Sequence, residues 1–564
     1  MRRWSTLAGI VLLGIAAIVV TQRRHEDVMV GPEAILHIVA DSEQELTRMP
    51  VRFTRMSDQE EIQAGDQIAE HYAAPKEEKP SAETLDVERY LTQVGTAVAI
   101  HAHRKLPYKV HYLRDRNIVD AFALPGGHVY VGAGLLALMD SEDELASVLG
   151  HEIEHVDHYH CAERLQQAQA LRKLPLGDWM AIPIQVFDAG YSKDQEFEAD
   201  REGVRLAVAA GYSPNGAIRM FETFQRLYDE YQGRSRTPQQ ELSQVAQEIL
   251  TGYFRSHPLP AERIQQIQTL ISSEHWPLHA ERDLAVAYIF TTDKAAAALA
   301  AHAYPQAQQL ALQSLRAHAE QAHALNILAQ AQFLQADFRG AAASYRKVIE
   351  LDPSQTDMAE AYAKALAAAD RATAATEFRR WLESLHSTES WGFQVPAAGL
   401  ALLAGDSAPA QRVTAQAEAS AGEEWSPHWL AELAWWYYLA GDNAAALELL
   451  NRAVQRRPGE TRFLVARAWV QIQNRTLADA LQSLDAAYDE SSPNDAERHM
   501  ARAVAYWQAH RSEDAMGEFE PVVLTSPEWR NPRWVQALYT PLVAESVQQM
   551  QAELDRRRKQ ARSQ

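Results

Sequence analysis

The sequence contains a single cysteine among 564 residues and has no excess of basic side chains. One cysteine cannot form an internal disulfide, so cysteine usage does not report on the redox state of the compartment. We expect this residue, Cys161, to be buried, and lipoprotein processing is excluded because no cysteine follows the only long apolar run. The formal net charge of −21 argues against a nucleic-acid partner, since binding one requires a basic surface that releases counterions.

The only long apolar run spans residues 4–22, which carry no charged side chain. A bilayer-spanning helix needs about 17–25 such residues. We expect residues 1–24 to be a retained signal anchor that crosses the bacterial inner membrane once, because the apolar run offers only a poor cleavage site. A cleaved signal peptide, which would leave a soluble periplasmic protein, is the alternative. Arginines flank both ends of the run, so the positive charges do not fix its orientation.

Residues 151–155 read HExxH, the pattern with the most specific chemistry in the chain. A capping pattern at Ser141, followed by apolar residues at helical spacing, predicts that the motif lies within a helix. Residues four apart share one face of a helix, so His151 and His155 can bind one cation. Glu152 would lie beside a water that the cation polarises, and zinc lowers the pKa of such a water to about 7, which makes it a nucleophile for peptide hydrolysis.

A catalytic zinc site needs a third protein ligand, for which the sequence offers three candidates. The first is the HExxHxxGxxH pattern, which fails because His158 stands in place of the glycine and Cys161 in place of the third histidine. The second is His158 or His160. We expect both to lie on a continuation of the helix, where neither can turn back to the same ion and a hydrogen-bonded role fits better.

The third candidate is Glu196, which precedes Asp200 by four residues. Ser192 and Gln195 form a capping pattern, so a second helix is predicted to begin here. Glu196 and Asp200 then share one face of that helix. Glu196 could bind the metal while Asp200 accepts the free N–H of a ligand histidine and fixes its tautomer.

The HExxH motif and the later ExxAD segment together resemble the metallopeptidase family that includes the CAAX prenyl protease type 1, HtpX and the periplasmic BepA-type proteases. The resemblance covers roughly residues 55–275. It implies one zinc ion per chain and the following roles: His151, His155 and Glu196 as ligands, Glu152 as general base and Asp200 as the partner of a ligand histidine.

Two further segments are similar to the same family. Residues 121–131 resemble its NAFALPGG-x-x-YV element, with Asp120 in place of the usual Asn. In the family this element is an edge strand that can pair with an extended substrate, which here implies the strand His128, Val129, Tyr130 and Val131. Residues 256–263 resemble its SHP-x-x-x-ER segment. That likeness implies that His257 and Arg263 face the active site, where a cation could stabilise an oxyanion. In the BepA-like branch the equivalent histidine can instead fill the open zinc position and hold the enzyme inactive.

From about residue 286 the composition shifts to Ala, Leu and Gln, and an internal repeat appears. Small residues recur every 33–36 positions, at Ala307, Ala341, Ala374, Ala410, Ala446, Ala480 and Ala515. This spacing is typical of the tetratricopeptide repeat (TPR), in which each unit is a pair of helices. We expect six or seven repeats that stack into an α-solenoid with a concave, protein-binding surface.

The predicted fold is mainly α, with an α+β, zincin-like metallopeptidase domain containing a small sheet, followed by the solenoid. The predicted segments are an anchor or signal peptide at residues 1–24, a linker at 25–54, the metallopeptidase domain at 55–275, the TPR domain at 286–530 and a C-terminal helical tail at 531–564.

These expectations favour a membrane-anchored zinc endopeptidase with its body in the bacterial periplasm. The TPR array would recruit polypeptide substrates, which we expect to be misfolded or assembling envelope proteins. The alternative is a TPR chaperone or scaffold whose zinc site is latent because His257 plugs it, although the intact Glu152 argues against a site without catalytic use. A prenyl-peptide protease is disfavoured, because that activity is expected to need several membrane spans and the sequence offers one.

Overall fold

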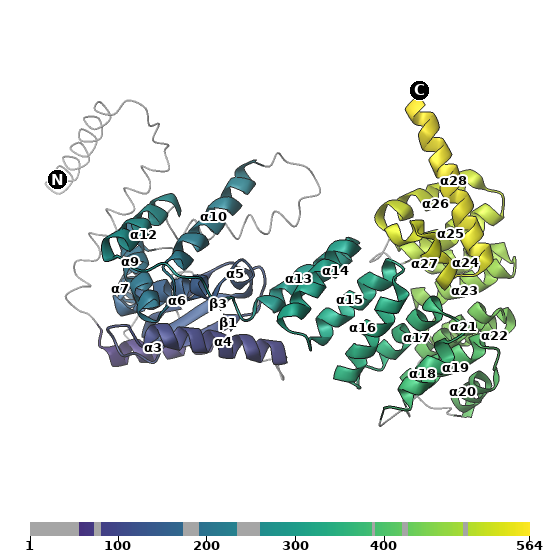
Figure 1. Ribbon diagram of the computed structural model, residues 1–564, viewed down its shortest axis with the longest axis horizontal. Coiled ribbons are helices and arrows are strands. Elements are labelled where there is room, and N and C mark those ends of the chain that lie inside the picture. The colour runs from purple at the N-terminus through teal and green to yellow at the C-terminus, as the bar shows by residue number, and fades with distance from the viewer. Residues whose placement is uncertain are drawn as a thin grey trace. The chain divides into compact units, whose positions relative to one another are not determined.

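The structure is a computed structural model, and it describes residues 56–72, 81–172, 191–233, 260–385, 390–419, 427–488 and 495–563. The chain divides into two compact units, with the boundary between residues 287 and 288. Helices dominate both units, and the described strands form one three-stranded sheet in the N-terminal unit (Figure 1). The predicted fold class, mainly α with a small sheet, is confirmed.

The predicted anchor and linker, residues 1–54, lie outside the described residues. Within the described part of the chain, no helix is both long enough and apolar enough to cross a membrane. The anchor at residues 1–24 therefore stays a prediction.

The N-terminal unit packs helices around the small sheet. Its elements are α3 (Asp58–Tyr72), α4 (Ala82–Ala99), β1 (Lys109–Leu113), β2 (Ala121–Leu124), η1 (Pro125–Gly127), β3 (His128–Gly132), α5 (Ala133–Leu136), α6 (Glu142–Asp157), α7 (His160–Arg172), α9 (Lys193–Ala209), α10 (Asn215–Gly233) and α12 (Pro260–Glu274). Helix α6, which carries the HExxH motif, packs against α4, α9, α10 and β2 and so lies at the centre of this unit.

The sheet has the strand order β1-β3-β2, so β3 is its central strand. The expectation that His128, Val129, Tyr130 and Val131 form an edge strand was wrong. The tight turn at Gly126 and Gly127, both with positive φ, pairs β3 antiparallel with β2, as a Pro-Gly-Gly turn predicts. The other side of β3 pairs in parallel with β1, a distant segment whose register no local pattern reveals. Among the described strands, β1 and β2 form the edges.

The C-terminal unit consists of consecutive helix pairs followed by a short terminal segment. The pairs are α13 (Ala287–Ala300) with α14 (Tyr304–Ala317), α15 (Ala322–Leu334) with α16 (Phe338–Leu351), α17 (Asp357–Ala369) with α18 (Ala374–Leu382), α19 (Trp391–Leu403) with α20 (Ala408–Ala419), α21 (Pro427–Ala440) with α22 (Asn443–Arg456), α23 (Thr461–Gln473) with α24 (Leu477–Ala486), and α25 (Ala496–Gln508) with α26 (Ser512–Thr525). The segments η3 (Pro527–Arg530), α27 (Pro532–Leu538) and α28 (Pro541–Ser563) follow.

The repeated alanines explain how these pairs stack. Each lies in the second helix of its pair, and all seven are at most 2% exposed. A side chain no larger than a methyl group lets neighbouring helices approach closely at that point. Six of the seven pairs also turn through a residue with positive φ, namely His302, Ala336, Gly405, Gly441, Arg475 and His510. The unit is therefore a repeat of one helix–turn–helix element, the architecture of a TPR array (Figure 1).

The end of the chain folds back onto the first repeats. The hydroxyl of Tyr304 in α14 donates a hydrogen bond of 2.6 Å to Glu528 in η3. The guanidinium of Arg533 lies 5.7 Å from the ring centre of Phe338 in α16, and α27 packs against α17. Contacts between residues more than 160 positions apart thus join the C-terminal segment to the first three repeats.

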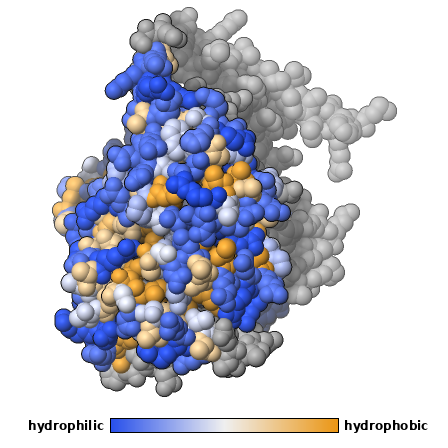
Figure 2. Space-filling model, turned by 90° about the vertical axis from the view of Figure 1, so that its right-hand side faces the viewer, coloured by the Kyte–Doolittle hydropathy of each residue, from blue (hydrophilic) through white to orange (hydrophobic). Residues whose placement is uncertain are grey.

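Figure 2 shows a face of the C-terminal helices that is largely hydrophilic, with hydrophobic residues in small groups between the polar ones. The large apolar side chains of this unit are mostly internal, and Trp436 and Trp469 are fully buried. Exposed large hydrophobics are scattered along the unit, as at Leu312, Leu351 and Leu524. Singly exposed apolar residues of this kind are ordinary for a soluble surface.

Candidate metal centre and active site

Helix α6 begins where the sequence predicts. The Ser141 side chain accepts a hydrogen bond from the backbone N–H of Glu144, although the Glu144 carboxylate bonds to the N–H of Asp140 and not to that of Ser141. The apolar residues that predicted the helix are completely buried, namely Leu145, Leu149, Ile153 and Val156. They fix the rotation of α6, so His151 and His155 project from the same face one turn apart.

Helix α9 also begins with the predicted cap. Ser192 and Gln195 form a complete capping box, in which each side chain bonds to the backbone of the other residue. Glu196 and Asp200 follow one turn apart and are 0% and 3% exposed. Buried carboxylates are costly unless charged or polar groups surround them, so their presence here indicates specific partners.

A pair of glycines lets α6 and α9 come together. A Cβ atom on Gly150 would lie 2.4 Å from the carbonyl oxygen of Gly203, and a Cβ on Gly203 would lie 2.6 Å from the backbone nitrogen of His151. Both distances are too short for a real side chain and involve backbone atoms that cannot rotate away. Close packing at Gly150 and Gly203 therefore brings Glu196 and Asp200 within reach of the two histidines.

Gly203→Ala is expected to push α9 away from α6 and to cost about 1–3 kcal/mol, the usual range for overpacking. The displaced α9 should also bind metal more weakly, because Glu196 moves with it. Thermal unfolding and bound metal per chain measure the two effects. Gly517→Ala is the control, since a Cβ there meets no atom within 4 Å in the middle of α26. If Gly203→Ala behaves like Gly517→Ala, the close approach does not hold the site together.

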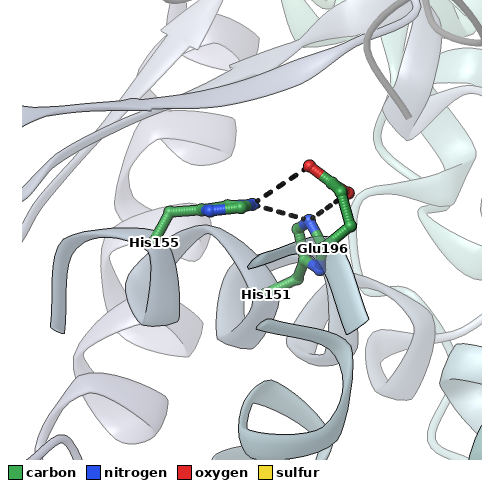
Figure 3. Close-up of side chains that lie close together, drawn as sticks. All are labelled: His151, His155 and Glu196. Atoms are coloured by element: carbon green, nitrogen blue, oxygen red, sulfur yellow. Dashed lines mark hydrogen bonds and ion pairs between the residues drawn. The ribbon is translucent and has the colours of Figure 1, made fainter. Parts of the chain in front are cut away.

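Three side chains converge between α6 and α9 (Figure 3). The Nε2 atoms of His151 and His155 lie 3.1 Å apart. The Glu196 carboxylate lies 3.5 Å from Nε2 of His151 and 3.6 Å from Nε2 of His155. One ligand atom from each residue falls within 4.8 Å of the others, a spacing that could hold a metal ion. Two imidazole nitrogens and one carboxylate oxygen form a donor set suited to zinc.

The ring nitrogen of His151 that points away from His155 and Glu196, Nδ1, also has a partner. This nitrogen lies 2.9 Å from Oδ1 of Asp200, as expected for a carboxylate that orients a ligand histidine. Arg263 of α12 donates two hydrogen bonds to the same carboxylate, one of 2.7 Å from Nε and one of 2.5 Å from Nη2. Burial opposes ionisation of Asp200, but the Arg263 guanidinium outweighs it and holds the pKa of this carboxyl below its usual value.

Arg263, which the resemblance places at the active site, lies beside the converging side chains: its Nη2 is 3.4 Å from Nδ1 of His151 and 3.7 Å from the Glu196 carboxylate. Its side chain is 2% exposed, packs over the ring of Phe221 at 4.3 Å, and directs its fork at Asp200. Arg263 thus holds Asp200 in place, and the role at a substrate oxyanion that the resemblance implies stays a prediction. His257, the other residue from this segment, lies outside the described residues.

Glu152 lies next to the three converging side chains and beside strand β2. It is 3% exposed, and its carboxylate accepts a hydrogen bond from the backbone N–H of Ala123. Burial raises the pKa of Glu152 well above its usual value, and the negative charges of Asp120 and Glu196 raise it further. A carboxylate with a raised pKa is well suited to accept and return a proton during a reaction.

An apolar cavity adjoins Glu152 and His151. Its walls include Val148, Val204 and the side chains Met220, Phe221 and Phe224 from α10. An apolar cavity beside a few converging polar groups is the usual form of a ligand-binding site.

The segment that follows the HExxH motif is not the continuous helix that the sequence predicts. Helix α6 ends at Asp157, Tyr159 adopts a left-handed φ of 62°, and α7 begins at His160. His160 is thereby turned back toward His155, with the two Nδ1 atoms 3.0 Å apart. The His155 ring also stacks on Tyr191 at 3.8 Å. Neither contact was predicted, because no sequence signal marks the left-handed residue that redirects His160, and the stack joins residues 36 positions apart.

Strand residue His128 lies away from the converging side chains. Its Nε2 is 3.0 Å from Asp66 of α3, and its Nδ1 is 2.9 Å from Nε2 of His111 in β1. Burial lowers the pKa of His128, which favours the neutral ring. His128 therefore belongs to the packing of the sheet. Cys161 is buried, as expected.

Residues 81–271 match the model of peptidase family M48. The putative beta-barrel assembly-enhancing protease of Vibrio cholerae is 32% identical over 200 residues, which are 32% of this chain and 38% of that protein. The beta-barrel assembly-enhancing protease of Escherichia coli is 29% identical over 200 residues, covering 31% of this chain and 37% of that protein. The mitochondrial metalloendopeptidase OMA1 of Schizosaccharomyces pombe is 32% identical over 149 residues, which are 25% of this chain and 43% of that protein.

The chain thus spans less than half of the length of these three relatives. Among solved structures, a tetratricopeptide repeat protein from Parabacteroides merdae aligns with 58% of this chain and 98% of its own, at 12% identity and a TM-score of 0.31. The matched region of the family model contains α6, α9 and most of α12, and with them every converging side chain described above. Residues 81–271, which include these side chains, are therefore similar to peptidase family M48.

Proposed function

We propose that the N-terminal unit is a zinc-dependent endopeptidase and that His151, His155 and Glu196 hold the ion. The observation that supports this most strongly is the convergence of these three side chains beside the buried carboxylate of Glu152. The donor set fits zinc, and the outer nitrogens of both imidazoles are occupied by Asp200 and His160, which leaves each Nε2 directed at the shared centre.

When bound, zinc would supply Lewis-acid chemistry, polarising a substrate carbonyl and lowering the pKa of water. The chain's own residues would then handle the proton. Glu152 takes the proton from the attacking water and returns it to the leaving amine. Asp200, held by Arg263, keeps His151 in the tautomer whose Nε2 is free to bind.

The edge strand of the sheet that lies nearest Glu152 is β2, since β3 is the central strand. An extended polypeptide could add to that edge, which places its backbone near Glu152. The apolar cavity beside Glu152 would accept a neighbouring side chain of the substrate. This arrangement supports hydrolysis within polypeptides.

We further propose that the TPR array recruits the polypeptide substrates, and that these are misfolded or assembling proteins of a bacterial envelope. The names of the Vibrio and Escherichia relatives, which refer to beta-barrel assembly, support this choice of substrate. The proposed location is the periplasm, with residues 1–24 as a single-pass anchor or a cleaved signal peptide. Possible partners are envelope assembly proteins bound through the repeats.

Removal of metal is expected to abolish casein cleavage by the purified full chain, and readdition of zinc should restore it. Glu196→Ala should contain far less zinc than wild type, because the carboxylate is one of three proposed ligands. Metal analysis by mass spectrometry gives the zinc content per chain. Glu202→Ala, one and a half turns further along α9 and paired with Arg205, is the control and should keep its zinc. Wild-type protein that lacks bound zinc and cleaves equally well in excess chelator would overturn the proposal.

A further inference from the structure

We propose that His160, backed by Glu198, is a positioning residue that holds His155 in the orientation and tautomer needed to bind the metal. The proposal rests on the zinc site described above and assigns a function to a histidine outside the HExxH motif. His155 is then oriented by a histidine and a glutamate, whereas His151 is oriented by Asp200 and Arg263.

The three groups form a continuous chain of contacts. Nδ1 of His155 lies 3.0 Å from Nδ1 of His160, and Nε2 of His160 lies 3.3 Å from Oε2 of Glu198. His155 and His160 are 0% and 3% exposed, whereas Glu198 is partly exposed at the outer end. This series of hydrogen bonds thus runs from the buried metal centre to the surface of the unit.

The carboxylate sets the direction of every hydrogen bond in this chain. A carboxylate can only accept, so Nε2 of His160 must carry the hydrogen that faces Glu198. A neutral imidazole has one N–H, so Nδ1 of His160 then holds a lone pair and accepts from Nδ1 of His155. The remaining nitrogen of His155, Nε2, is left with its lone pair toward His151 and Glu196. This is the tautomer that binds a metal ion.

The backbone conformation between α6 and α7 places His160 next to His155. The left-handed Tyr159 ends α6 and turns the chain, which α7 then continues from His160 itself. On an unbroken helix, residues five apart would not place their rings in this contact. Tyr191 stacks on the His155 ring at 3.8 Å with an interplanar angle of 16°, so the plane of the ring is held as well as its hydrogen bond.

His158 provides a natural comparison. It lies two residues before His160 and is bonded through Nδ1 to Glu154 at 2.7 Å, with its side chain 30% exposed. Its ring centre is 5.9 Å from that of His160. Its Nε2 reaches Glu198 only at 4.0 Å, longer than the 3.3 Å of His160, and its short bond is to Glu154. Replacing His158 should therefore leave His155 in place.

The test compares zinc affinity of the full-length chain carrying His160→Leu, His160→Asn or His158→Asn, measured by competition with a chromophoric chelator. Loss of a partner that orients a ligand histidine usually weakens metal binding about 10- to 100-fold. We expect that loss for His160→Leu. Asn places its side-chain oxygen at the branch position of Nδ1, so His160→Asn should recover most of the affinity. His158→Asn should match wild type, and the metal-free variants should unfold at nearly the wild-type temperature.

Equal zinc affinity of His160→Leu and wild type would overturn the inference while leaving the zinc site intact, provided that Glu196→Ala still loses its metal. Equal losses in His160→Leu and His160→Asn would also overturn it, because the acceptor would then be irrelevant. The same holds if both variants lose their fold without metal, which would show a purely structural role. Wild-type protein that binds no zinc would remove the proposed function itself.

Discussion

Glu152→Gln is expected to lower peptide hydrolysis by about 10²- to 10⁴-fold, the usual contribution of a general base. The amide keeps the size of the side chain and can still accept the hydrogen bond from the Ala123 backbone, but it cannot take a proton from water. Zinc binding should persist, because Glu152 is not among the proposed ligands. Casein cleavage and zinc content, measured on the same preparation, separate loss of chemistry from loss of metal.

Glu154→Gln is the matched control for this experiment. Glu154 lies two residues further along α6, is equally buried and bonds to His158, away from the metal centre. It should retain most of the activity. His257→Ala tests the alternative of a latent site. If only that variant cleaves casein, the wild-type site is autoinhibited, whereas equal residual cleavage by wild type, Glu152→Gln and His257→Ala would refute the peptidase proposal.

Arg263→Leu is expected to destabilise the N-terminal unit by about 3–5 kcal/mol, since removal of one partner leaves a buried charge uncompensated. Asp200 is that charge, and Arg263 supplies both short bonds of the pair. Loss of the pair should also release His151 from its fixed tautomer and weaken zinc binding. Denaturant unfolding, followed by hydrogen exchange in α6 and α9, locates the change in this unit.

Arg205→Leu is the control, because Arg205 forms ion pairs with Glu202 and Glu274 on the exposed side of α9. Exposed pairs of this kind contribute about 0–1 kcal/mol. A double variant, Arg263→Leu with Asp200→Leu, should recover part of the lost stability, since the unpaired charge is gone. If Arg263→Leu is no more destabilising than Arg205→Leu, the buried pair does not carry the stability assigned to it.

Local spacing predicted most of the elements that form the candidate site. The interval of four residues put His151 with His155, and Glu196 with Asp200, on single helix faces, and capping residues marked where both helices begin. The repeated alanines likewise predicted the helix pairs, because a small side chain is required wherever two helices meet once per repeat. These features depend on helix geometry, which is encoded within a few residues.

The features that were missed depend on contacts between distant segments or on one unusual backbone angle. The pairing of β1 with β3 makes β3 central, and nothing near residues 128–131 reveals it. The bond from Arg263 to Asp200 joins residues 63 positions apart, so no local pattern reveals it. The left-handed Tyr159 redirects His160, and an ordinary aromatic residue gives no sign of that conformation in the sequence.

The hydrogen bond between Tyr304 and Glu528 has a consequence for how the C-terminal unit comes apart. A linear solenoid contacts only its neighbours, so its outermost units have the fewest contacts and fray before the rest. Here the Tyr304–Glu528 bond joins the first repeat to η3, and α27 packs against α17 of the third repeat, so neither end of the array can open without losing contacts with the other. We therefore expect the ends of this array to be cut by proteases more slowly than the free ends of a linear array, and its repeats to unfold more cooperatively.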